Sequence, residues 1–161
     1  MSEPVITPEQ LGKHWQGHRA LTRRVIEAFP EESLFQLSVG GMRPFAVLAI
    51  EMIGMADGGI DGLATKAWPK VQDLLQHNGP AAPRTRKELL EHWDRVTAKI
   101  DRLWPQIPAG RFQETEKAFG QWESRMIDLF LYWIDNEIHH RGQGYVYLRA
   151  LGIEPPPFYE R

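Results

Sequence analysis

Four stretches of the chain place apolar residues three and four positions apart, the spacing of an amphipathic helix, and two of them begin with a helix-capping signature. In the first signature, Thr7 can cap the helix, Pro8 suits its first turn, and Gln10 can complete a capping box. Thr85 and Glu88 form a second capping box after the loop NGPAAPR. The pattern predicts helices over about residues 8–28, 43–65, 86–104 and 124–151.

The segments between these helices contain proline and glycine and are predicted to be connections. Residues 30–41 indicate a loop, and residues 105–122 indicate a loop with a short extended pair. The chain has no strong alternation of apolar and polar residues, which a β-sheet would require. The expected fold is therefore all-α: a four-helix bundle forming a single domain over residues 1–161, with long connections that allow topologies other than up-and-down.

The composition excludes several classes of protein. The chain has 19 Lys and Arg against 21 Asp and Glu, so no broad positive surface favours nucleic acid or an anionic membrane as a partner. It has no cysteine, which removes disulfides, zinc–thiolate sites and cysteine nucleophiles. It has neither the pattern of a signal peptide nor an apolar stretch of membrane-spanning length, so a cytoplasmic location is expected.

The sequence DNEIHHRGQGYVYLRALG, residues 135–152, places several polar side chains in a helix that must also reach the core. The apolar residues from Phe130 to Leu148 favour His140 as the inward histidine and His139 as the outward one. In the second helix, Glu51 lies within VLAIEMI, where all its neighbours are apolar. Whichever face of that helix is buried, Glu51 must lie close to it.

A buried carboxylate and a buried imidazole both need partners, so Glu51 and His140 are expected to pair across the helices. The pairing is either a direct hydrogen bond or a shared metal ion. Spacing alone favours the hydrogen bond, because one His with a Glu or Asn is a weaker metal signal than three His. Asn136 and Glu137 can face the same way as His140. Without a metal, the Glu51–His140 pair is either a base with its orienting partner or purely structural.

Further candidates lie near these residues. His14 and His18 are four residues apart, a spacing that can chelate zinc, but no matching carboxylate accompanies them, which favours a pair at the edge of the core. His18 can still reach the interior and is kept as a pocket residue. Arg141 is a second pocket candidate, although an ordinary surface charge is the simpler interpretation. Gly142 in mid-helix suggests close packing or room for a ligand.

The C-terminal sequence HHRGQGYVYLRALGIEPPPF closely resembles the last helix and tail of the DinB-like (damage-inducible B) proteins, which are related to YfiT-type metal-dependent hydrolases and thiol-dependent transferases. The capped first helix, PEESL and GGMRPFAVLAIEMIG occur in the order of that family, so the resemblance covers most of the chain. It implies a four-helix bundle with a long crossover connection, which is often dimeric and commonly binds one divalent metal through three histidines.

The resemblance also implies where such a metal site would lie. The family histidine of the second helix falls on Glu51, and those of the last helix fall on Asn136 and His140. Only His140 keeps the family residue, while Glu51 and Asn136 offer oxygen ligands and Glu137 is an alternative to Asn136. The expected cofactor is one divalent metal, with Zn, Ni, Mn or Fe as candidates, or none.

Two functions follow as hypotheses. The first is a divalent-metal-dependent enzyme, a hydrolase or thiol-dependent transferase, that acts on an unknown small molecule through Glu51, Asn136 and His140. The second is a non-catalytic helical bundle that binds a small ligand or a partner and keeps the polar cluster for structure. A homodimer is expected from the resemblance and from Trp15, Trp93 and Trp122, aromatic residues that four helices need not fully bury.

Overall fold

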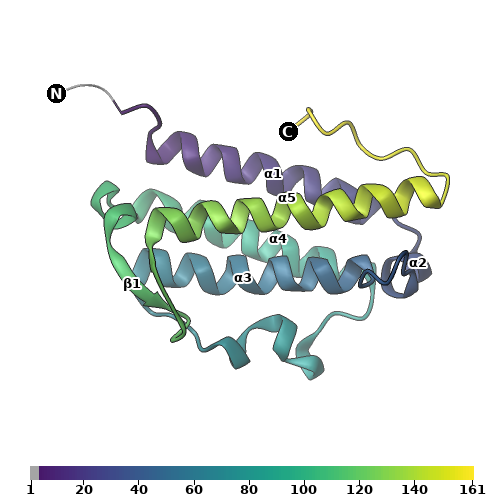
Figure 1. Ribbon diagram of the computed structural model, residues 1–161, viewed down its shortest axis with the longest axis horizontal. Coiled ribbons are helices and arrows are strands. Elements are labelled where there is room, and N and C mark those ends of the chain that lie inside the picture. Colours follow the sequence, from purple (N-terminus) through teal and green to yellow (C-terminus); the bar gives the residue numbers. More distant parts are fainter. Residues whose placement is uncertain (1–3) are drawn as a thin grey trace.

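The computed structural model describes residues 4–161. Long helices make up most of it, joined by short helical turns and one small hairpin (Figure 1). The α-helices and strands are α1 (Pro8–Ala28), α2 (Glu31–Gln36), α3 (Phe45–Thr65), α4 (Arg86–Leu103), β1 (Thr115–Ala118), β2 (Trp122–Arg125) and α5 (Met126–Ala150). Single turns of 3-10 helix occupy Val71–Asp73, Leu75–His77, Gly79–Ala81, Trp104–Gln106 and Ala109–Gln113.

Both predicted capping boxes are present. The Thr7 side chain accepts a hydrogen bond from the backbone of Gln10, whose side chain in turn accepts one from the backbone of Thr7. Thr85 and Glu88 form the same arrangement at the start of α4. Each box satisfies amide groups that the first turn of a helix leaves free, so α1 and α4 begin where the sequence indicates.

The four long helices lie side by side (Figure 1). Helices α1 and α3 each pack against both α4 and α5 and contact each other much less, so they lie diagonally opposite. Helices α1 and α5 run in one direction and α3 and α4 in the other (Figure 1). Because α3 and α4 are parallel, the connection from the end of α3 to the start of α4, residues 66–85, must run the length of the molecule.

The crossover, residues 66–85, lies against the outer side of α3 and contacts a row of glycines there. A β-carbon at Gly62 would overlap the Trp68 ring, and one at Gly58 would lie 2.7 Å from Pro69. Each glycine costs roughly 1 kcal/mol of helix stability against alanine. The glycines of α3 therefore allow a close approach of the crossover rather than a break in the helix.

The expectation of an all-α fold is confirmed in part. Helix predominates, but β1 and β2 form a two-stranded antiparallel sheet, with Thr115 opposite Arg125 and Ala118 opposite Trp122. Phe119 and Gly120 close the hairpin with positive φ angles of 53° and 71°. The hairpin confirms the predicted extended pair, and it delays the start of α5 to Met126, two residues after the predicted start.

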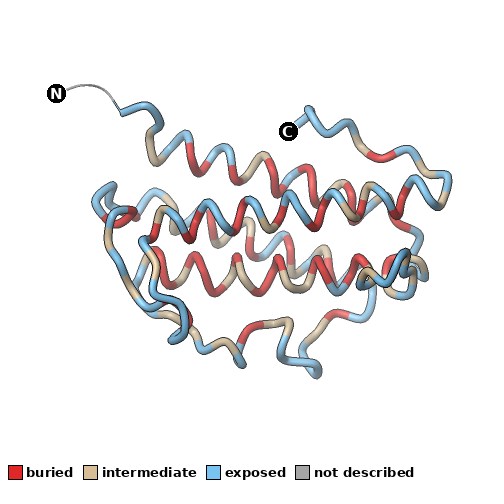
Figure 2. Tube along the Cα trace, in the orientation of Figure 1, coloured by how far each residue is buried: buried red, intermediate tan, exposed pale blue. Residues whose placement is uncertain are grey.

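Buried residues recur along all four long helices (Figure 2). Trp15 and Trp93 belong to this core, each at most 1% exposed, whereas Trp122 is 51% exposed. The argument that surplus tryptophans indicate a dimer is therefore wrong for Trp15 and Trp93, because the contacts of α1, α4 and α5 cover them. Homodimerisation stays a prediction of the family resemblance.

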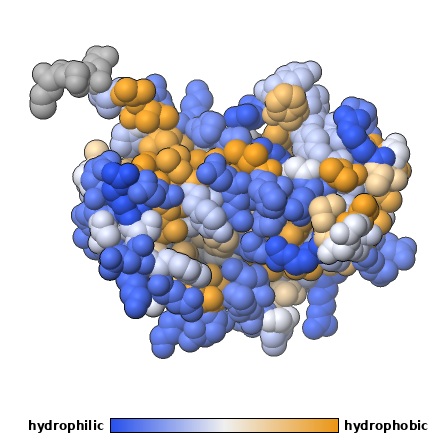
Figure 3. Space-filling view, in the orientation of Figure 1, coloured by the Kyte–Doolittle hydropathy of each residue, from blue (hydrophilic) through white to orange (hydrophobic). Residues whose placement is uncertain are grey.

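The face of the molecule seen in Figure 3 is largely polar. On the face shown in Figure 3, hydrophilic side chains cover most of the area and hydrophobic ones form small separate groups. Within residues 4–161, no helix combines the length and apolar character needed to cross a bilayer.

Candidate functional site

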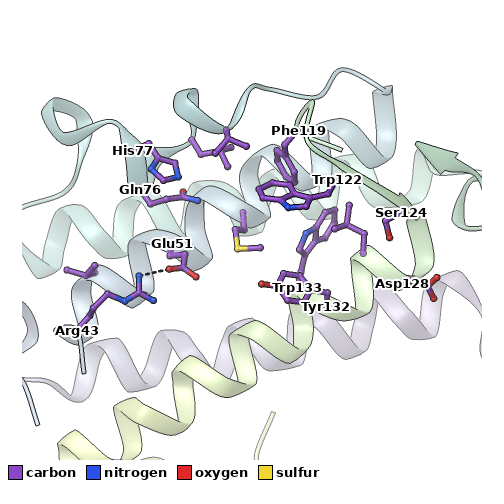
Figure 4. A pocket seen from close by; sticks show the side chains of 15 residues that line it. Arg43, Glu51, Gln76, His77, Phe119, Trp122, Ser124, Asp128, Tyr132 and Trp133 are labelled. Carbon is purple, nitrogen blue, oxygen red and sulfur yellow. Dashed lines mark hydrogen bonds and ion pairs between the residues drawn. The ribbon is translucent and has the colours of Figure 1, made fainter. Parts of the chain in front are cut away.

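A cavity of about 610 Å³ lies between α3, the crossover, the hairpin and α5. Figure 4 shows Arg43, Glu51, Gln76 and His77 at one end, four aromatic side chains along the middle, and Ser124 and Asp128 at the other end. Apolar and aromatic groups form most of its wall: Val47, Met55, Val71, Leu74, Phe119, Trp122, Leu129, Tyr132 and Trp133.

Glu51 joins two hydrogen-bond donors at the polar end of this cavity. Its Oε2 lies 2.6 Å from Nη1 of Arg43, and its Oε1 lies 3.0 Å from Nε2 of His140. His140 is buried and His139 is exposed, as the sequence predicts. The structure thus brings Glu51 and His140 into direct contact and adds Arg43 to the pair.

These contacts determine the charge on Glu51. The hydrogen bond with His140 lowers the pKa of Glu51 to about 2, with a further contribution from the bond with Arg43, although partial burial acts in the opposite direction. An ionised carboxylate only accepts hydrogen bonds, so His140 donates to Glu51 from Nε2. The Nδ1 atom of His140 is buried and has no hydrogen-bond partner among the described residues.

The third predicted ligand, Asn136, does not complete a metal site. Its amide nitrogen points to the sulfur of Met55, 3.6 Å away. Over residues 4–161, no three His, Cys, Asp or Glu side chains are grouped so that they could hold a metal ion. One imidazole and one carboxylate already bound to a guanidinium do not fit a divalent metal.

Glu137 lies on a different side of α5. Its carboxylate accepts a hydrogen bond of 2.6 Å from the Thr22 hydroxyl of α1 and lies 3.9 Å from the Arg141 guanidinium. The expectation that Glu137 could replace Asn136 beside His140 is therefore wrong. One residue further along a helix turns the side chain by about 100°, which here directs Glu137 to α1 and Asn136 to α3.

His18 and Arg141 also lie at this α1–α5 contact and not in the cavity beside Glu51. Arg141 donates from Nη2 to Nδ1 of His18 at 2.9 Å, and both residues are buried. The two pocket candidates are thus close to each other but belong with Glu137. We call Glu137, Thr22, His18, Arg141 and the nearby Arg19 the α1–α5 polar cluster.

Burial dominates the electrostatics of this cluster. It lowers the pKa of His18 to about 3, with the Arg141 charge acting in the same direction, and lowers the pKa of Arg19 to about 10. It raises the pKa of Glu137, although Arg19 and the Thr22 hydrogen bond act in the opposite direction. Arg19 lies over the Trp93 ring, with its guanidinium carbon 4.2 Å from the ring centre. The side chains of the cluster are buried, but Arg141 also lines a second cavity between α5 and the C-terminal segment, and Nε2 of His18 lies 3.2 Å from Nη1 of Arg161.

The other predicted features occupy the outside of α1 and α5. His14 and His18 bring their Nε2 atoms to 3.1 Å, with His14 exposed, which is the predicted pair at the edge of the core. Gly142 has no heavy atom within 4 Å of a β-carbon position and lines a second cavity, of about 570 Å³, between α5 and the C-terminal segment. Of the two reasons suggested for this glycine, the structure shows open space rather than close packing.

Sequence reasoning missed most of the cavity wall. Arg43 was the nearest of the missed residues to Glu51 in sequence, but it precedes α3, so helical spacing does not predict that its side chain returns to Glu51. Gln76, His77 and the aromatic residues of the hairpin carried no signal in the sequence, because the crossover and the hairpin bring them to α3 from distant parts of the chain.

Comparisons with known proteins agree with this arrangement. A DinB-like protein from Bacillus cereus ATCC 10987 is 20% identical in sequence, and the match covers 94% of this chain and 97% of that one with a TM-score of 0.73. A DinB-like protein from Bacillus subtilis is 15% identical, with 94% and 99% covered and a TM-score of 0.71. No curated protein matches the chain. The model of the DinB family matches residues 1–161, so the chain belongs to the DinB family.

Proposed function

We propose that this DinB-family protein binds a small, uncharged and mainly apolar molecule in the cavity beside Glu51. The observation that carries the proposal is the end of the cavity: an aromatic-walled space finishes at a carboxylate whose two oxygens already have donors, Arg43 and His140. Such a group can orient a ligand, but it needs no ligand charge to balance it.

The size and wall of the cavity support this function. A volume of about 610 Å³ is in the range of small-molecule sites, which are typically apolar with a few placed polar groups. Trp122 of the hairpin and Tyr132 of α5 line the cavity and are each about half exposed, so they offer ring faces to a ligand that enters from solvent.

The charges of the cavity support an uncharged ligand. Glu51 is paired with Arg43, and Asp128 at the opposite end is paired with Arg125 at 3.0 Å. A charged ligand group buried here would lose its water without gaining a free counter-charge.

The protonation of Glu51 favours binding over acid–base catalysis. A general base works best with a pKa near the working pH, and the pKa of Glu51 is about 2. In the proposal, Glu51 fixes the Arg43 and His140 side chains. These three side chains form the polar end of the cavity, called here the polar floor, against which the ligand lies.

Titration with a neutral, environment-sensitive apolar dye tests the proposal. Val47→Trp places an indole in the cavity from a position 41% exposed, and Val146→Trp makes the same change at a valine 51% exposed that does not line it. We expect one dye per chain, a loss of affinity of about tenfold or more in Val47→Trp, and unchanged affinity in Val146→Trp. Equal affinities in the two variants would refute the proposal.

A second candidate function is the metal-dependent hydrolase or thiol-dependent transferase expected from the family resemblance. Its support is the contact of Glu51 with His140, because a carboxylate and an imidazole are both metal ligands, and a metal would enter there only by breaking their hydrogen bond. Elemental analysis of protein purified without an affinity tag distinguishes the functions. One divalent metal per chain, lost in Glu51→Gln, would support the enzyme and count against the metal-free binding site.

A further inference from the structure

Arg43 is held at both ends. Its backbone carbonyl accepts a hydrogen bond of 2.7 Å from the Tyr147 hydroxyl of α5, and the following Pro44 restricts its backbone. Its guanidinium returns along α3 to Glu51, eight residues later. Its side chain remains about half exposed, so the ion pair lies at the edge of the core.

The Glu51 carboxylate has one donor on each oxygen. Arg43 holds Oε2 and His140 holds Oε1, so a cation that binds this carboxylate must displace one of them. Displacing His140 would leave its Nε2–H group without its carboxylate acceptor, whereas displacing Arg43 would place a divalent ion next to a guanidinium.

We propose that Arg43 is a built-in cation that holds one oxygen of Glu51 and, by placing a positive charge on this carboxylate, closes the site to divalent metals. Arg43 is in this sense a specificity-determining residue, because its charge balances that of the Glu51 carboxylate. Asn136 acts in the same direction, since it faces Met55 and supplies no third ligand. The inference goes beyond the proposed function, and it holds whether or not the cavity binds an apolar molecule.

The charge of Arg43 can be removed with little effect on the fold. Arg43→Met removes the guanidinium but keeps an unbranched aliphatic stem, while Arg43→Lys keeps a positive charge. Arg149→Met is a matched control, because Arg149 is an exposed arginine of α5 that pairs with Glu154 outside the cavity. Circular dichroism and metal-free melting temperatures of each variant check that it folds.

Calorimetric titrations of tag-free protein with Zn²⁺ and with Mn²⁺ at neutral pH test the proposal. Each variant is measured with and without Glu51→Gln, and the difference isolates binding at Glu51 from binding at surface histidines such as His14. We expect Arg43→Met to gain a Glu51-dependent site about tenfold or more tighter than that of the unaltered protein. Arg43→Lys and Arg149→Met should resemble the unaltered protein.

The same comparison is repeated with Asn136→His, which adds a third ligand, and a second nitrogen, one helical turn before His140. Arg43→Met should again raise the affinity by about tenfold or more. The proposal is overturned if Arg43→Met raises the metal affinity in neither background. It is also overturned if the unaltered protein binds metal at Glu51 as tightly as Arg43→Met does. Failure of the dye to bind would refute the proposed function and leave these metal affinities unchanged, so the two failures are distinguishable.

Discussion

Glu51 lies on α3 between donors from two other places, Arg43 before the helix and His140 on α5. Its pKa therefore depends on the fold, because the unfolded chain brings none of these groups together. Folding lowers the pKa of Glu51 from 4.5 to about 2. The folded protein thus binds fewer protons than the unfolded chain between these pH values, and stability rises with pH there.

The consequence is a specific acid sensitivity. The stability contributed by Glu51 is complete above about pH 5 and is lost as the pH falls toward 2. We expect Glu51→Gln to destabilise the protein at pH 6, and the gap to the unaltered protein to shrink by about 1–2 kcal/mol at pH 3. Urea unfolding of both proteins at pH 6 and pH 3 measures this difference in stability. Glu154→Gln, at an exposed ion pair, should show no such change. A gap for Glu51→Gln that stays constant with pH would contradict the assigned pKa shift.

On the scale of the helices, glycines of α3 and α5 have opposite roles. Gly62 allows the Trp68 ring to approach α3, whereas Gly142 on α5 faces open space. Gly142→Ala should therefore stabilise the protein by about 0.5–1 kcal/mol, because alanine favours the helix and meets nothing. Gly62→Ala should destabilise it by about 1–3 kcal/mol, because Trp68 must move. Thermal and urea unfolding measure both, and changes of the same sign would contradict the packing of the crossover.

The helices with capping boxes were predictable because their signals are local. Thr7 with Gln10 and Thr85 with Glu88 define the starts of α1 and α4 within four residues of sequence. Short α2 (Glu31–Gln36) was missed, because six residues with no side-chain cap carry little periodic signal. The glycines of α3 predicted a locally weakened helix, because nothing in the local sequence shows that the crossover packs on them.

The candidate site was predictable only where helical spacing decided it. The inward direction of His140 and its contact with Glu51 follow from apolar neighbours and from the cost of burying unpaired polar groups. The separation of Glu137 from Asn136 did not follow, because the number of neighbouring helices and their positions around α5 are properties of the whole fold. The cavity itself requires the crossover and the hairpin, whose positions the sequence does not reveal.

On the scale of the whole molecule, two separate clusters of polar side chains lie on different sides of α5. The α1–α5 polar cluster is buried between these two helices, and its Arg141 borders the cavity beside the C-terminal segment. The Arg43–Glu51–His140 group lies at the end of a cavity of about 610 Å³ that adjoins solvent through Trp122 and Tyr132. In this chain the α3 side of α5 thus faces a cavity, and the α1 side makes a buried, polar contact.

The central claim is that the Glu51 end of the cavity is a metal-free polar floor for an uncharged ligand. A crystal structure of tag-free protein grown with the neutral dye and excess Zn²⁺, with an anomalous map at the zinc edge, tests it most directly. The predicted result is dye density along the aromatic wall, Arg43 on Glu51, and no zinc peak within about 2.5 Å of Glu51 or His140. A zinc peak bonded to Glu51 and His140, with Arg43 displaced, would contradict the account.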